Sequence, residues 1–198
     1  AARRRAAMSA DVPAQIRQAE EYKEAGNAHF KEQNFKKALG SYHKVFCYVN
    51  GLQIPGQQSA ASSYAEMMPG VGQGAGPKVP EDKVEDVLRL KQSTHLNMAA
   101  CYLKVQEHHK CVAACTKALE GGQLSKAYFR RGQAHLELRA LDEAKADFAA
   151  AQALEPSDPA IDRELRRLKQ AFAQHEAKER KRFAKMFKSM ADEPEEGE

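Results

Sequence analysis

One spacing pattern occurs three times along the chain and constrains the fold more than any other feature. Each copy has a small residue, a second small residue twelve positions later, and an aromatic or sulfur-bearing residue four positions after that. The three sets are Gly26, Ala38 and Tyr42; Ala99, Cys111 and Cys115; and Gly132, Ala144 and Phe148. Small residues let two helices approach closely, and the larger side chain fills the space beside them. The pattern therefore predicts stacked helix pairs that bury a continuous core.

The spacing between copies reveals an insertion. Ala99 and Gly132 are 33 residues apart, whereas Gly26 and Ala99 are 73 residues apart. Helix-pair repeats of this kind are about 34 residues long, so roughly 39 extra residues separate the first two copies. Glycine and proline supply 10 of the 30 residues in the segment 51–80. We predict that this segment is a mobile loop and that helix resumes at Glu81.

The third copy matches a known repeat in most detail. It carries Tyr128, Gly132, Ala144, Phe148, Ala151 and a closing Pro156 in order. This arrangement resembles the tetratricopeptide repeat, and the resemblance covers roughly residues 19–156. The second copy departs from it, because cysteines fill two core positions and GGQLS replaces the closing proline. The resemblance implies an all-α fold of three helix-turn-helix repeats in a right-handed superhelix, with an extended C-terminal helix.

These observations divide the chain into segments. We expect a flexible N-terminal segment at 1–10, a repeat domain at 11–156 that contains the loop insertion 51–80, a helix at 157–190 and an acidic tail at 191–198. Ser157 or Asp158 suits the start of the late helix, with Pro159 in its first turn. The late helix then places Ile161, Leu165, Leu168 and Phe172 at helical spacing. These apolar residues are expected to cover the exposed face of the last repeat.

Composition narrows the class of protein. No apolar run approaches the roughly 20 residues that span a bilayer, so we expect no membrane association. The four cysteines lack the spacing of a disulfide framework, which favours a reducing, cytoplasmic setting. A net charge of +4 is too small to indicate nucleic-acid binding by itself. No nucleophile with a base, metal set or phosphate loop is recognisable, so we expect a binding module without a cofactor.

The first helix of each pair lines the inside of such a superhelix, so its polar residues are the binding candidates. They are Lys23 and Asn27 on the first such helix, Asn97 on the second, and Lys126 and Arg130 on the third. Three cations and two amides around one groove suit a ligand with two carboxylates on one residue, such as a peptide that ends in aspartate. The alternative is a solvated charged groove that binds a different ligand.

The same five positions resemble the carboxylate clamp of repeat co-chaperones, which bind the EEVD-type tails of heat-shock proteins 90 and 70. The resemblance implies that Lys23, Lys126 and Arg130 supply charge to the terminal carboxylates, while Asn27 and Asn97 orient them. The segments KAYFRRGQAHLEL and KERKRFAKMFKSMADE resemble the large immunophilins, of the FK506-binding protein and cyclophilin types. The insertion after YHKVFCYVNGL resembles the tetratricopeptide repeat protein 9 group. A general repeat scaffold for another peptide is the alternative function.

A basic amphipathic segment follows the repeats. Residues 176–188 carry six lysines and arginines against two glutamates. The residues Arg182, Phe183, Met186 and Phe187 are candidates for a second contact, with calmodulin, as the likeness to immunophilin helices implies, or with the body of a chaperone. The alternative is a solvated helix end whose apolar residues fold back on the repeats.

The cluster of His108, His109, Cys111 and Cys115 contains residue types that bind zinc. The two cysteines fall at core positions of the repeat, and adjacent histidines on a helix point in different directions. We therefore predict that these thiols pack in the core and that the chain holds no metal.

Overall fold

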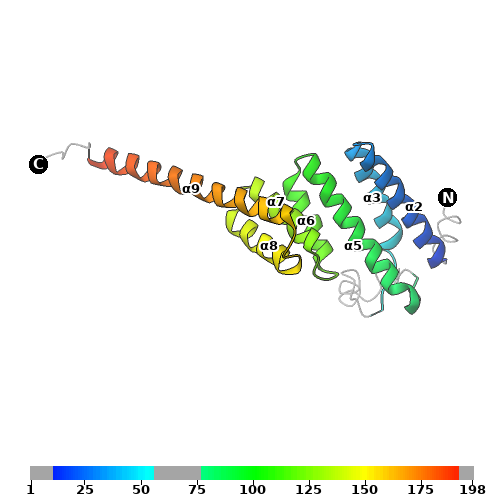
Figure 1. Ribbon diagram of the computed structural model, residues 1–198. Helices are drawn as coiled ribbons and strands as arrows, with labels where there is room; N and C mark the ends of the chain where they lie inside the picture. The colour runs from blue at the N-terminus through cyan, green and yellow to red at the C-terminus, as the bar shows by residue number, and fades with distance from the viewer. Residues whose placement is uncertain (1–10, 56–76, 192–198) are drawn as a thin grey trace, which may run out of the picture.

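The computed structural model of the chain describes residues 11–55 and 77–191, which are almost entirely helical (Figure 1). The helices are α2 (Val12–Lys31), α3 (Phe35–Val49), α5 (Glu81–Lys104), α6 (His108–Leu119), α7 (Ser125–Glu137), α8 (Leu141–Leu154) and α9 (Pro159–Ala191). The first six form three consecutive pairs, and each pair packs against the next. The predicted all-α fold of three helix pairs and a C-terminal helix is confirmed. Residues 1–10, 56–76 and 192–198 lie outside the described part, so the flexible segment, most of the loop and most of the tail stay predictions.

The repeated small residues bring the two helices of a pair into contact. A Cβ atom on Gly26 would lie 2.4 Å from Cε1 of Tyr42, and one on Gly132 would lie 2.7 Å from Cε1 of Phe148. Ala38 and Ala144, at the second small position of the same pairs, are completely buried. The ring on the second helix therefore lies directly against the backbone of the first.

The turn inside each pair is built in the same way in all three repeats. Gln33, Gln106 and Arg139 adopt the left-handed conformation, with φ of 60°, 61° and 63°. The next residue in each case donates its N–H to the carbonyl oxygen five residues earlier, at 2.9 Å in the first two turns and 3.0 Å in the third. This arrangement closes the C-terminal end of the first helix and reverses the chain. The second helix of every pair thus begins at an equivalent position.

The two ends of the insertion are joined to each other. The Gln53 N–H donates to the Pro77 carbonyl oxygen at 3.1 Å, and the Val79 N–H donates to the Gln53 carbonyl oxygen at 2.9 Å. Leu52, Ile54 and Val79 are buried in the same core as the first helix pair. The prediction of a mobile loop over 51–80 is therefore wrong at its two ends, where Leu52, Ile54 and Val79 are fixed to the repeats.

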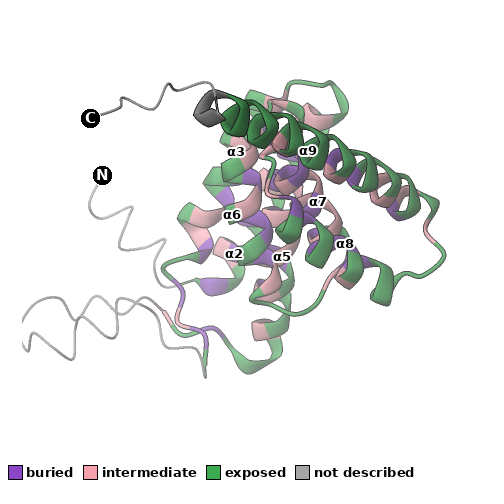
Figure 2. Ribbon diagram, turned by 90° about the vertical axis from the view of Figure 1, so that its left-hand side faces the viewer, coloured by how far each residue is buried: buried purple, intermediate pink, exposed green. Residues whose placement is uncertain are grey.

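Helix α9 has two parts with different surroundings. It begins where an Asp158 carboxylate oxygen accepts a hydrogen bond from the Ala160 N–H at 2.8 Å. The predicted cover for the last repeat is confirmed, because Ile161 and Leu168 are buried and Leu165 and Phe172 are partly buried. Beyond Phe172 the helix continues past the repeats (Figure 1), and its side chains there are mostly exposed (Figure 2). Within the described ranges no helix is long and apolar enough to cross a membrane.

Replacing Gly132 and Gly40 by alanine should change the stability of the domain in opposite directions. Gly132→Ala should lower the free energy of unfolding by about 1–3 kcal/mol, because its methyl group would overlap the Phe148 ring. Gly40 lies on the exposed side of α3 with no atom within 4 Å of its Cβ position. Gly40→Ala should therefore raise stability by about 0.5–1 kcal/mol through helix propensity. Urea unfolding followed by circular dichroism measures both, and equal effects would contradict the packing.

Candidate functional site

The five candidate residues lie on α2, α5 and α7, the first helices of the three pairs. The structure brings Asn27 of α2 and Asn97 of α5 into direct contact, because the Asn97 Nδ2 donates to the Asn27 Oδ1 at 2.9 Å. This hydrogen bond joins residues 70 positions apart in the sequence. Both side chains are half-buried.

The amide of Asn27 has a defined orientation. Its Oδ1 accepts a second hydrogen bond, at 2.8 Å, from the hydroxyl of Tyr42 on α3. A carbonyl oxygen has two lone pairs, so both are occupied. The Nδ2 of Asn27, which has no partner among the described residues, is the part of this amide that remains for a ligand, and it is a donor.

Arg130 of α7 places a positive charge next to this pair of amides. Its NH1 donates to the Leu96 carbonyl oxygen of α5 at 2.6 Å, next to Asn97 in the sequence. Burial lowers the pKa of this guanidinium, and the groups facing it are the thiols of Cys115, Cys111 and Cys101 and the phenol of Tyr42. No carboxylate in the described ranges pairs with Arg130. The site therefore contains a partly desolvated positive charge without a counter-ion in the described part of the chain.

Two other arginines near the groove are fully paired. Arg131 donates to both carboxylate oxygens of Asp147, with distances of 2.7 to 3.1 Å, and Asp147 is only 4% exposed. Arg167 of α9 pairs with Glu137 at 2.8 Å and with Glu164 at 2.9 Å. Among these three arginines, Arg130 is therefore the one without a carboxylate partner in the described ranges.

The two lysines are placed less tightly. Lys126 is exposed and Lys23 is half-buried, and neither makes an ion pair with another described residue. Each lies one helical turn before Asn27 or Arg130 on the same helix, so its flexible side chain can reach the same region. The structure therefore joins Asn27 and Asn97 directly and leaves Lys23 and Lys126 at the margin.

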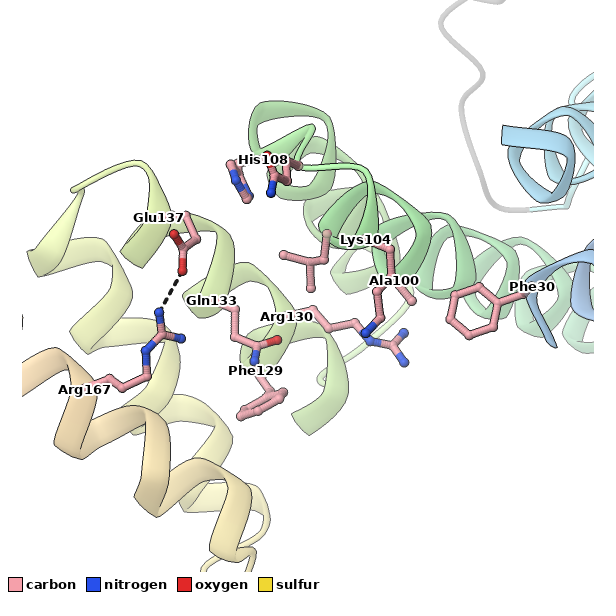
Figure 3. A pocket seen from close by; sticks show the side chains of 11 residues that line it. Phe30, Ala100, Lys104, His108, Phe129, Arg130, Gln133, Glu137 and Arg167 are labelled. Carbon is pink, nitrogen blue, oxygen red and sulfur yellow. Dashed lines mark hydrogen bonds and ion pairs between the residues drawn. The ribbon is translucent and has the colours of Figure 1, made fainter. Parts of the chain in front are cut away.

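A groove of about 630 Å³ extends from Arg130 toward α9 (Figure 3). Figure 3 shows the Arg130 side chain directed from α7 toward α5, with Phe30 of α2 beyond it. The wall is mixed, since Phe30, Leu103 and Phe129 alternate with polar residues such as Gln133. At the far end the Arg167–Glu137 ion pair ties α9 to α7. Such a surface suits an extended peptide with apolar and polar side chains.

Sequence reasoning assigned Tyr42 to the core and missed its contact with the site. The ring is indeed buried, at 1% exposure, but the hydroxyl reaches the amide of Asn27. One signal was available: the equivalent position in the third copy is Phe148, so the hydroxyl is not needed for packing. The aromatics Phe30 and Phe129 of the groove were also missed, because a single aromatic on a helix usually indicates core.

The thiols considered for zinc form part of the core beneath Arg130. Cys111 and Cys115 are completely buried, which confirms the packing interpretation. The Cys111 thiol donates to the Arg130 carbonyl oxygen at 3.7 Å. A hydrogen bond with Cys111, together with burial, raises the pKa of the Cys115 thiol, and burial raises that of Cys101 to about 11. Cys101 and Cys115 are therefore neutral at neutral pH and fill the core as small apolar residues.

The second candidate surface lies away from the groove. Phe183, Met186 and Phe187 are 50%, 46% and 65% exposed, and Arg182 is also exposed. The alternative that these apolar side chains fold back on the repeats is therefore wrong. Whether they contact a partner stays a prediction.

Comparisons with known proteins show which proteins this chain resembles. A scan against models of protein families finds no match. Over 172 residues the chain is 33% identical to the mouse (Mus musculus) peptidyl-prolyl cis-trans isomerase FKBP4, covering 86% of this chain and 32% of that protein. The chain thus spans about a third of the length of this relative.

Several solved structures share the fold, and two illustrate it. The C-terminal TPR-containing domain of an FK506-binding protein from Plasmodium falciparum has a TM-score of 0.66 at 19% identity, covering 84% of this chain and 96% of that one. The first TPR of Spaghetti (RPAP3), bound to the HSP90 peptide SRMEEVD, has a TM-score of 0.56 at 25% identity, covering 79% and 94%. The described residues therefore form a tetratricopeptide-repeat domain. In sequence this domain resembles the repeat region of the immunophilin isomerases, and the calmodulin hypothesis finds no support among these proteins.

The contrast between Arg130 and Arg131 predicts different roles for neighbouring residues. Arg131→Ala should lower the free energy of unfolding by about 3 kcal/mol, because it leaves the buried Asp147 carboxylate without its main partner. Arg130→Ala should change stability by less than about 1 kcal/mol, because it removes one hydrogen bond and relieves an unpaired charge. Chemical denaturation of the two variants checks this, and a similar loss in both would show that Arg130 is also structural.

Proposed function

We propose that this chain is a co-chaperone module that binds the acidic C-terminal tail of heat-shock protein 90 or 70 through a carboxylate clamp. Lys23, Asn27, Asn97, Lys126 and Arg130 form the clamp. These chaperones are cytosolic, so the proposal places the chain in the cytoplasm. The function is binding, and no residue is assigned a catalytic role.

The observation that carries the proposal is the unpaired charge of Arg130. A partly buried guanidinium costs free energy unless an anion or several acceptors satisfy it. Here one carbonyl oxygen accepts from it, and no carboxylate in the described part of the chain does. A carboxylate ligand would supply the missing partner in a bidentate geometry that suits arginine.

The neighbouring groups complete a site for two carboxylates on one residue. Asn27 presents its Nδ2 as a neutral donor, because its Oδ1 is already occupied. Lys23 on α2 and Lys126 on α7 would add flexible point charges from the helices on either side of α5. The aspartate at the end of an EEVD-type tail carries both a side-chain and a main-chain carboxylate, so the donors and the acceptors correspond in kind.

Two further observations support this partner over other acidic peptides. The groove next to Arg130 combines apolar and polar wall residues, which suits the valine and glutamates that precede the terminal aspartate. The Spaghetti domain, which shares the fold at 25% identity, is bound to a peptide that ends in EEVD. The exposed residues Arg182, Phe183, Met186 and Phe187 of α9 remain a predicted second contact surface, separate from the clamp.

A peptide ending in EEVD should bind the chain, and its C-terminally amidated form should bind at least tenfold more weakly. The reason is that a hydrogen bond to a charged group contributes about 1.5–3 kcal/mol. Lys126→Ala and Arg130→Ala should each weaken binding of the free acid about tenfold or more. Lys145→Ala, which removes an exposed lysine from α8 on the outer layer, is the matched control. Isothermal titration calorimetry measures the wild type with both peptides and the three variants with the free acid, and equal affinity of the wild type for acid and amide would reject the clamp.

A pull-down separates the proposal from the general scaffold. Heat-shock proteins 90 and 70 should be captured from a lysate by the wild-type chain and by Lys145→Ala, and lost with Lys126→Ala. Partners of a scaffold that recognises an internal peptide segment would remain with Lys126→Ala, because no terminal carboxylate is involved. Retention of the chaperones by Lys126→Ala would favour the scaffold or another surface.

A further inference from the structure

Tyr42 belongs to two parts of the protein at once. Its ring is buried against Gly26, in the contact that joins α2 to α3. Its hydroxyl is bonded to Cζ, one of the ring atoms nearest Gly26, and donates to Asn27 Oδ1 at 2.8 Å. Asn27 follows Gly26 in the sequence, so the residue that sets the helix spacing also contacts a proposed clamp residue.

The hydroxyl matters because an asparagine amide can face a ligand in two ways. With Nδ2 outward it donates to a carboxylate, and with Oδ1 outward it repels one. The hydrogen bonds from Tyr42 and from Asn97 Nδ2 both hold Oδ1 inward. Each of these donors therefore favours the orientation that binds an anion.

A comparison of the three copies shows that the asparagine and the hydroxyl occur in the same copy. The positions equivalent to Asn27 are occupied by Ala100 and Gln133, and those equivalent to Tyr42 by Cys115 and Phe148. Phe148 packs on Gly132 as Tyr42 packs on Gly26, so a ring without a hydroxyl satisfies the core. Gln133 instead donates its amide Nε2 to Glu164 of α9. Among these equivalent positions, the phenol occurs in the same copy as the amide that it contacts.

We propose that Tyr42 is a positioning residue of the clamp, which holds the Asn27 amide with Nδ2 toward the terminal carboxylates of a bound tail. This inference rests on the proposed function. Burial raises the pKa of the phenol to about 12, so the hydroxyl stays protonated and remains a donor throughout the neutral range. Tyr42 itself makes no contact with the ligand and acts through Asn27.

The test uses Tyr42→Phe, which keeps the ring against Gly26 and removes only the hydroxyl. The affinity for an EEVD-ending peptide should fall about three- to tenfold, as expected for one hydrogen bond, while the weak affinity for the amidated peptide stays the same. In an Asn27→Ala background, Tyr42→Phe should have a much smaller effect, because the Asn27 amide is gone and only the interaction of the hydroxyl with Asn97 remains. A purely structural role would instead lower the affinity by the same factor in both backgrounds.

Asn27→Asp provides a second variant that leaves the ring untouched. Aspartate still accepts from Tyr42 and Asn97, but it replaces the outward donor with an anionic oxygen. The unfolding transition should be retained, and binding of the free acid should fall more than tenfold. Calorimetry on these variants decides the inference. It is overturned if Tyr42→Phe binds as wild type or if Asn27→Asp retains binding, whereas a wild-type chain that does not distinguish acid from amide overturns the clamp itself.

Discussion

The geometry of the groove depends on how closely the two helices of a pair approach at a glycine. At Gly26 and Gly132 a ring from the second helix lies where a side chain of the first would otherwise be. Since interiors are close-packed and stiff, this contact fixes the distance between the outer and inner layers. In the first and third pairs this contact sets the position of α2 and α7, whereas in the second pair the equivalent positions are Ala99 and Cys115, which are also buried. Binding geometry is thus a consequence of backbone packing.

Neighbouring arginines on α7 have different electrostatic surroundings because their side chains point in different directions. Arg130 and Arg131 are adjacent, and successive residues on a helix point about 100° apart. Arg131 turns toward α8 and is neutralised by Asp147, whereas Arg130 turns toward α5 and is left with the Leu96 carbonyl oxygen. One cation stabilises the fold and the other remains available for a ligand. Adjacent positions on α7 therefore differ in whether a protein carboxylate neutralises them.

Much of this arrangement follows from the sequence. The repeated small and aromatic positions predict the helix pairs, and Pro159 with the preceding Asp158 predicts the start of α9. The five inner-helix candidates follow from residue type, helix position and the resemblance to known repeat proteins, and their role stays a proposal. Spacing in the sequence does not predict which side chains from distant segments contact each other. The hydrogen bond between Asn27 and Asn97 spans 70 residues, and the acceptor of Arg130 is a backbone oxygen that no residue type identifies.

The joined ends of the insertion have a consequence for how this domain can vary. Gln53 is hydrogen-bonded to residues 77 and 79, and Leu52, Ile54 and Val79 are anchored in the first core. The geometry of α3 and α5 is thus set before and after the segment that connects residues 55 and 77. Loop-closure entropy rises only slowly with length, by about 0.6 kcal/mol for each doubling. Evolution can lengthen, shorten or replace that connection while the register of the repeats stays the same, which makes it a natural place to graft a new recognition element onto an unchanged domain.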